Sequence, residues 1–119
     1  MKGMTFTEIA FAFSNGAFAK VYPFLHEKIE WEVIGESVYS GKTAVMDQCA
    51  STAAYFESVT TVFTTESVIT EGHQVAVSGT AEFIRNQQRV AFVKACDLYL
   101  FNEEGKLVSI RSYCIPEKK

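Results

Sequence analysis

Apolar side chains near the start of the chain recur at helical spacing. Thr5 and Glu8 can form a capping box, because the Thr5 hydroxyl can accept the Glu8 amide while the Glu8 carboxylate reaches the Thr5 amide. An apolar stripe follows at intervals of three and four residues, namely Phe6, Ile9, Ala10 and Phe13. The pattern predicts a helix that starts at this box and stops at Asn15 and Gly16.

The next segments change between helical and strand-like patterns. Residues 18–25 repeat the helical spacing, but Pro23 removes an amide and crowds the preceding turn, so the second helix should be short or kinked. Residues 28–34 are strand-like, and Gly41 precedes a third predicted helix over residues 42–56. The predicted buried face of that helix carries Val45, Cys49, Ala53 and Phe56.

From residue 60 onward, apolar residues recur at every second position. Turn residues break this pattern near Gly72, near Asn86 and near Gly105, which predicts four antiparallel strands. In the second of them, one face carries Val75, Val77, Gly79, Ala81 and Phe83, and the other face is polar. With no linker or repeat in the chain, one α+β domain over residues 1–119 is the economical prediction.

Composition and charge narrow the class of protein. The chain has 119 residues, a net charge of -3 and a pI near 5.4, so it lacks the basic patch that a nucleic-acid partner requires. Its three cysteines have no C-x-x-C spacing, which favours reduced thiols in a cytoplasm over disulfides or zinc. No signal-like or membrane-length segment is present, and His26 and His73 suggest no metal site. We therefore expect a mature cytoplasmic protein without cofactor, metal or membrane partner.

Asp97 stands out chemically, because it lies in the otherwise apolar strand VKACDLYLF. A carboxylate in such surroundings is costly unless its desolvation is compensated. If Asp97 faces the interior, strand alternation also sends Val93 and Tyr99 inward, and Tyr99 becomes a local hydrogen-bond donor. In the alternative interpretation, Asp97 accepts backbone or hydroxyl hydrogen bonds as a purely structural group, and the sequence leaves both open.

The order of elements and four short motifs resemble the nuclear transport factor 2-like superfamily in its SnoaL-like branch. The motifs are IEWEV at 29–33, GK at 41–42, CDLY at 96–99 and GKLVSI at 105–110. The resemblance implies a cystatin-like α+β fold, in which a cone-shaped antiparallel or mixed sheet wraps around the N-terminal helices and leaves an apolar cavity. Members bind or transform small molecules, and many are homodimers through the outer sheet face.

Within this superfamily, the last hairpin is similar to that of ketosteroid isomerase. The resemblance puts Asp97 on the protonated oxyanion-hole aspartic acid of that enzyme, Glu32 on its catalytic base, and Ile9 on a tyrosine donor. A base and a donor are what proton transfer next to a carbonyl needs. Strand alternation sets Glu32 and Trp31 on opposite faces unless a bulge intervenes, and the blander interpretation is a solvated glutamate beside a core tryptophan.

The same comparison and the alternation of the strands supply the other candidate site residues. On the final strand, Ile110, Ser112 and Cys114 share the expected cavity face. No histidine or lysine is adjacent in sequence to activate Cys114, so packing is favoured over a nucleophilic role. The remaining ligand-binding candidates are Trp31, Phe13, Phe56, Val93 and Tyr99. Aromatic residues of this kind form the core in most proteins, and in a cone fold the inner layer serves both purposes.

Three hypotheses of function follow. The leading one is a cytoplasmic homodimer whose cavity holds a small apolar molecule with an oxygen function, anchored by Asp97. The second is an isomerase, cyclase or dehydratase with Glu32 as base and Asp97, together with Tyr99, as donor. The third is a non-catalytic interaction module with a filled interior. The homodimer is predicted from an outer sheet patch of Leu98, Leu100, Leu107, Arg111 and Tyr113, although a terminal extension or a loop could also cover it.

Overall fold

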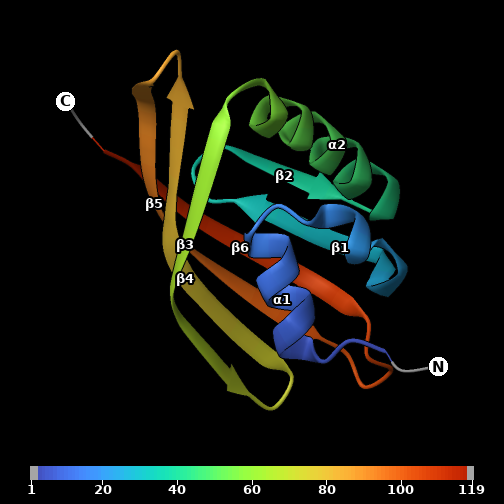
Figure 1. The fold of residues 1–119 in the computed structure, drawn as a ribbon. Helices are drawn as coiled ribbons and strands as arrows, with labels where there is room; N and C mark the ends of the chain where they lie inside the picture. The colour runs from blue at the N-terminus through green and yellow to red at the C-terminus, as the bar shows by residue number, and fades with distance from the viewer. Residues whose placement is uncertain (1–2, 118–119) are drawn as a thin grey trace.

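The computed structural model describes residues 3–117 and has two helices packed on one mixed six-stranded sheet (Figure 1). Its α+β class and its curved sheet agree with the sequence-based prediction. The elements in chain order are α1 Phe6–Ser14, η1 Phe18–Lys20, η2 Tyr22–Phe24, β1 Leu25–Val33, β2 Ser37–Ser40, α2 Lys42–Ser58, β3 Thr60–Glu71, β4 Gln74–Arg85, β5 Gln88–Phe101 and β6 Leu107–Pro116. No helix within residues 3–117 combines the length and the apolar character needed to cross a membrane.

The helix starts and stops follow the local signals. Glu8 N donates to Thr5 Oγ1 over 3.1 Å and Thr5 N donates to Glu8 Oε1 over 2.8 Å, which confirms the capping box of α1. The helix stops at Asn15, and Gly16 follows with a positive φ of 82°. The short second helix consists of two 3₁₀ turns, the second of which contains Pro23. α2 extends two residues beyond its predicted end.

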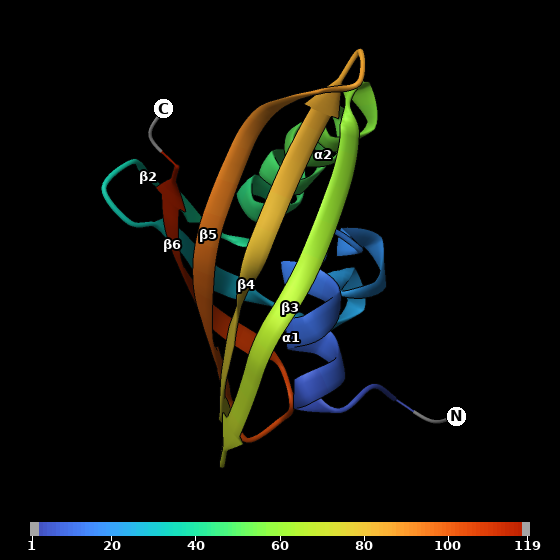
Figure 2. The same cartoon turned by 60° about the vertical axis from the view of Figure 1, so that its left-hand side comes forward.

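The sheet has the strand order β2-β1-β6-β5-β4-β3. All neighbours are antiparallel except β1 and β6, which pair in parallel and make the sheet mixed. β2 is an addition to the predicted elements, since its four residues pair with the end of β1. The long strands curl around the helices, and both helices lie against the concave face, while no helix of residues 3–117 covers the outer face (Figure 2).

The core fills the concave side of the sheet. Its largest fully buried members include Tyr99, Phe101, Ile9, Leu25, Ile29 and Ile110. Side chains of this kind each stabilise the fold by roughly 1.5–3 kcal/mol when fully buried. The predicted inner face of α2 is buried at Val45 and Cys49 but only half-buried at Ala53 and Phe56. The core is therefore dense near the start of α2 and looser toward its end.

Leu107 was wrongly predicted to lie in the outer sheet patch, since it is fully buried in the core. The pairing between β5 and β6 shifts between Leu100 and Phe101, which face Ser109 and Leu107 respectively. An extra residue in one strand of a pair reverses the direction of the side chains beyond it. Strand alternation in the sequence does not reveal such a bulge. The bulge puts Leu107 on the face opposite to the one predicted.

Candidate functional site

A cavity of about 320 Å³ lies between the concave sheet face and the helices. This volume is at the small end of the range of roughly 300–1,000 Å³ typical of small-molecule sites. Its apolar wall includes Phe13, Phe18, Trp31, Phe56, Phe63 and Val77. Within residues 3–117, no group of three or more His, Cys, Asp or Glu side chains is placed to hold a metal ion.

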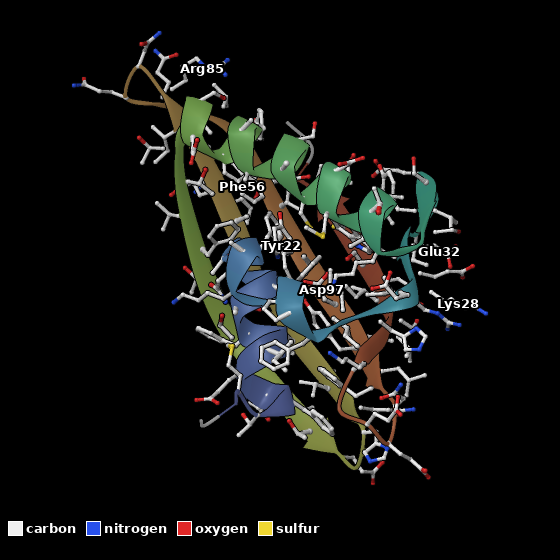
Figure 3. The ribbon with its side chains drawn as sticks, turned by 90° about the vertical axis from the view of Figure 1, so that its right-hand side faces the viewer. Tyr22, Lys28, Glu32, Phe56, Arg85 and Asp97 are labelled. Carbon is white, nitrogen blue, oxygen red and sulfur yellow. The ribbon has the colours of Figure 1, made fainter. Side chains whose placement is uncertain are left out.

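Asp97 lies on the sheet wall of this cavity and is hydrogen-bonded to the end of α1 (Figure 3). Ser14 Oγ donates to Asp97 Oδ2 over 2.8 Å, and Ser14 Oγ lies 2.6 Å from the Tyr99 hydroxyl. Because Ser14 has one hydroxyl proton and gives it to Asp97, Tyr99 must be the donor to Ser14. The three side chains therefore form a directed chain of donors that ends at the carboxyl group.

A second pair of side chains approaches Asp97 from β6 and β1. Ser112 lies directly opposite Asp97 in the β5–β6 pairing, and Trp31 Nε1 donates to Ser112 Oγ over 3.0 Å. The Ser112 oxygen accepts from the indole, so its own proton is free to bond to the neighbouring carboxyl group. Asp97 is thus surrounded by hydroxyl donors from α1 and β6.

The protein environment favours the neutral form of Asp97. Burial raises the pKa of this carboxyl group above its ordinary value, and the hydroxyls of Ser112, Ser14 and Tyr99 oppose the shift only in part. Burial, together with the nearby Asp97 charge, also holds the pKa of the Tyr99 hydroxyl well above its usual range, so Tyr99 remains a proton donor. No lysine, arginine or histidine lies among the described residues that line the cavity.

The structure brings most of the sequence-predicted ligand-binding residues together. The cavity is lined by Asp97 and by Trp31, Phe13, Phe56, Val93, Ser112 and Cys114. Tyr99 lies behind the wall and reaches the site through Ser14, and Ile110 is fully buried in the core without lining the cavity. Burial raises the pKa of the Cys114 thiol to about 11, so it is neutral near pH 7.

Glu32 does not line the cavity, which corrects its predicted place beside Asp97. In β1, Trp31 and Val33 face the cavity, and alternation turns Glu32 to the opposite face, toward the outside of the molecule (Figure 3). In the register of the parallel β1–β6 pair, Glu32 lies opposite Arg111. The β1–β2 turn instead places an exposed carboxyl group, that of Glu36, at the cavity.

Several polar residues of the site were missed in the sequence, among them Ser14, Glu36, Gln48 and Thr52. Gln48 and Thr52 had a usable signal, because they lie three and seven residues after Val45 and so share the inner face of α2. Ser14 follows the apolar stripe of α1 directly, where a polar residue normally marks the end of a helix. Glu36 lies in a turn, for which periodicity gives no direction.

Comparison with known proteins identifies the family. Residues 6–110 match the model of the SnoaL-like domain. An NTF2-like protein of unknown function from Cytophaga hutchinsonii is 34% identical, with a TM-score of 0.81 over 90% of this chain and 93% of that one. A search of curated proteins found no match to the chain.

Two enzymes have a similar fold at lower sequence identity. An LEH-like epoxide hydrolase of M. tuberculosis is 18% identical, with a TM-score of 0.67 over 92% of this chain and 82% of that one. The epoxide hydrolase/cyclase-like enzyme SalBIII acts in pyran ring formation in the polyether salinomycin. It is 21% identical, with a TM-score of 0.71 over 92% of this chain and 90% of that one. These likenesses concern the fold alone, whereas the domain match covers most of the sequence. The chain belongs to the SnoaL-like family of the NTF2-like superfamily.

Proposed function

We propose that this protein binds a small, largely apolar molecule with a carbonyl or hydroxyl group, and that Asp97 is its polar anchor. The observation that carries the proposal is a carboxyl group on the wall of an aromatic cavity, with hydroxyl partners and no cation among the described lining residues. An aspartate that served only the fold would be expected to have its hydrogen bonds satisfied away from open space. Asp97 instead borders the cavity.

Either protonation state of Asp97 can bind an oxygen function. In the neutral form, which burial favours, the carboxyl group donates to a ligand carbonyl. In the ionised form it accepts from a ligand hydroxyl. Ser14 and Ser112 hold the carboxyl group in place from two sides, so little side-chain freedom is lost on binding.

Proton-transfer catalysis is a second candidate function, favoured by the presence of two carboxyl groups in one cavity. Besides burial, the charges of Asp97 and Glu36 both raise the pKa of Cys114, which also lines the cavity. An isomerase, cyclase or dehydratase on this scaffold would use Glu36 as base in place of Glu32, with Asp97 as donor. Deuterium uptake next to the carbonyl of a bound ketone, compared in wild type and Glu36→Gln, separates catalysis from binding.

We expect 2-naphthol to bind wild type and to lose affinity by about tenfold in Asp97→Asn and about a hundredfold in Asp97→Ala. A hydrogen bond to a charged or strongly polar partner contributes roughly 1.5–3 kcal/mol, and 1.4 kcal/mol is tenfold in affinity. The asparagine amide can still donate, whereas alanine cannot. Calorimetric titration measures the affinities.

The single tryptophan gives this experiment an independent readout. Trp31 lines the cavity, so its one indole N–H signal in a proton–nitrogen NMR spectrum should shift as the ligand binds. Glu32→Gln is the matched control, because it removes a carboxylate outside the cavity and should leave affinity unchanged. Equal affinity in wild type and both Asp97 variants would remove Asp97 as the anchor. Failure of wild type to bind phenols and naphthols would contradict the proposal itself.

The homodimer is proposed through the outer sheet face, which no helix in the described part of the chain covers (Figure 2). Large apolar side chains are exposed there, namely Ile69, Leu98, Leu100, Tyr113 and Ile115. Exposed apolar patches of this kind mark interaction surfaces, and a symmetric pair is the commonest way to cover one.

Light scattering after gel filtration should therefore give twice 13.3 kDa, about 27 kDa, for wild type. Leu98→Glu places a charge on the patch and should shift the mass to that of one chain. Phe11→Glu is the control, because Phe11 is exposed on α1, on the other side of the sheet from the patch, and this variant should remain dimeric. A wild-type mass of one chain at micromolar concentration would contradict this arrangement.

A further inference from the structure

The inner face of α2 carries two polar residues where its helical pattern calls for apolar ones. Val45 and Cys49 on this face are fully buried, and Gln48 and Thr52 lie between and beyond them. Both polar side chains line the cavity. A polar group on a buried helix face is costly unless it finds a partner, so the choice of glutamine and threonine here needs an explanation.

Gln48 retains free hydrogen-bonding capacity. Its Nε2 donates to Thr52 Oγ1 over 3.2 Å, and its side chain forms no other hydrogen bond within residues 3–117. A glutamine amide has two donor hydrogens and an acceptor oxygen, so one N–H and Oε1 remain available. Within residues 3–117, every fully buried side-chain nitrogen or oxygen has a hydrogen-bond partner. Because Gln48 Oε1 has none, it is accessible, and the space beside the Gln48 side chain is the cavity.

The Gln48–Thr52 pair and Asp97 lie on different walls of the same cavity. α2 crosses the concave side of the sheet, and Asp97 projects toward this side from β5 (Figure 3). The volume of about 320 Å³ equals the liquid volume of roughly ten water molecules. A ligand with about ten non-hydrogen atoms therefore fills the space and can contact both walls at once.

Charge further restricts the class of ligand. Asp97 and Glu36 supply the carboxyl groups of the lining, and its described residues include no cationic side chain to offset them. An anionic ligand would meet like charge in a site of reduced dielectric, which disfavours it. The free groups of Gln48 and Thr52 are neutral donors and acceptors, which suit hydroxyl and carbonyl groups.

We infer that Gln48 and Thr52 form a second polar contact, and that the preferred ligand is a neutral molecule of bicyclic size with an oxygen function at each end. One end bonds to Asp97 and the other to the Gln48–Thr52 pair, with the aromatic wall around the apolar middle. This inference rests on the proposed function and adds to it the second contact and the class of ligand.

The test compares 2-naphthol with naphthalene-2,6-diol, which differ by one hydroxyl at the far end. We expect wild type to bind the diol about fivefold more tightly, since one hydrogen bond contributes about 1 kcal/mol and 1.4 kcal/mol is tenfold. Gln48→Met and Thr52→Val keep side-chain size while removing the polar groups, and the double variant should lose the diol advantage, so that its affinities for the diol and for 2-naphthol agree within about twofold. The 6-hydroxy-2-naphthoate anion should bind more weakly than the diol.

Gln88→Met is the control, because it makes the same chemical change on an exposed residue outside the cavity. The diol advantage should persist in it. If wild type binds 2-naphthol through Asp97 but the diol no more tightly, the second contact is refuted while the proposed function stands. The same conclusion follows if the advantage survives in the Gln48 and Thr52 double variant. If wild type binds neither compound, both the proposed function and this inference fail.

Discussion

An alanine at Gly79 is expected to lower the free energy of unfolding by about 3 kcal/mol, the upper end of the usual cost of overpacking. On β4, a Cβ at this position would overlap the Thr64 carbonyl oxygen and lie 3.1 Å from the Thr65 Cα. These are backbone atoms of the paired strand β3, which cannot rotate away as a side-chain tip can. Urea unfolding followed by circular dichroism measures the change.

Gly3→Ala is the matched control, because the added methyl group would lie 4.0 Å from its nearest neighbour, the Phe24 ring. We expect it to change stability by less than about 0.5 kcal/mol. Equal stability of the two variants would show that the strands do not need this close approach. Gly79 also lines the cavity, opposite a bulge of β3 between Thr65 and Ser67. Because bulges bend strands, the same contact helps to shape the site.

The fold was largely predictable because its signals are local. The Thr5–Glu8 capping box, the kink at Pro23 and the turn glycines each act through neighbouring residues, and they set the ends of the elements. The two departures depend on strand pairing. β2 has four residues and is recognisable only beside β1, and Leu107 changes face because its partner strand shifts register. The sequence pattern of one strand predicts neither the presence of β2 nor the register shift at Leu107.

The site was predictable where one strand determined the direction of a side chain. Alternation along β5 and β6, with the ketosteroid isomerase resemblance to choose the inner face, predicted Asp97, Ser112 and Cys114 as cavity residues, and all three line the cavity. The hydrogen bond from Ser14 to Asp97 joins residues 83 positions apart, and no local pattern records which helix end reaches which strand. Cavity residues that are brought together by the packing of distant elements could therefore not be predicted from the sequence.

The choice between Trp31 and Glu32 has a chemical consequence. Alternation allowed only one of them to face inward, and the structure places Trp31 there, bonded to Ser112. The interior of the site then contains one carboxyl group, while the second, on Glu36, belongs to an exposed turn residue. The protonation state of Asp97 therefore decides which oxygen function the buried end of the cavity can bind.

A neutral aryl ketone, 2-acetonaphthone, is expected to bind tightly at low pH and to lose about tenfold in affinity for each pH unit above the Asp97 pKa. A ketone can only accept a hydrogen bond. When Asp97 is ionised, the Ser14 proton is directed to the carboxylate and the Tyr99 proton to Ser14, so this chain offers the ketone no donor. Neutral Asp97 supplies the missing donor.

The sign of this pH dependence follows from the direction of the pKa shift. Burial raises the pKa of Asp97 from its ordinary value of 3.8, so the neutral, donating form persists above that pH, and ketone affinity declines only as the pH rises through the raised pKa. Asp97→Asn should give a flat profile, because its amide donates at every pH. Calorimetric titrations across the range in which circular dichroism shows a folded protein measure both profiles. A wild-type profile as flat as that of Asp97→Asn would exclude Asp97 as the donor.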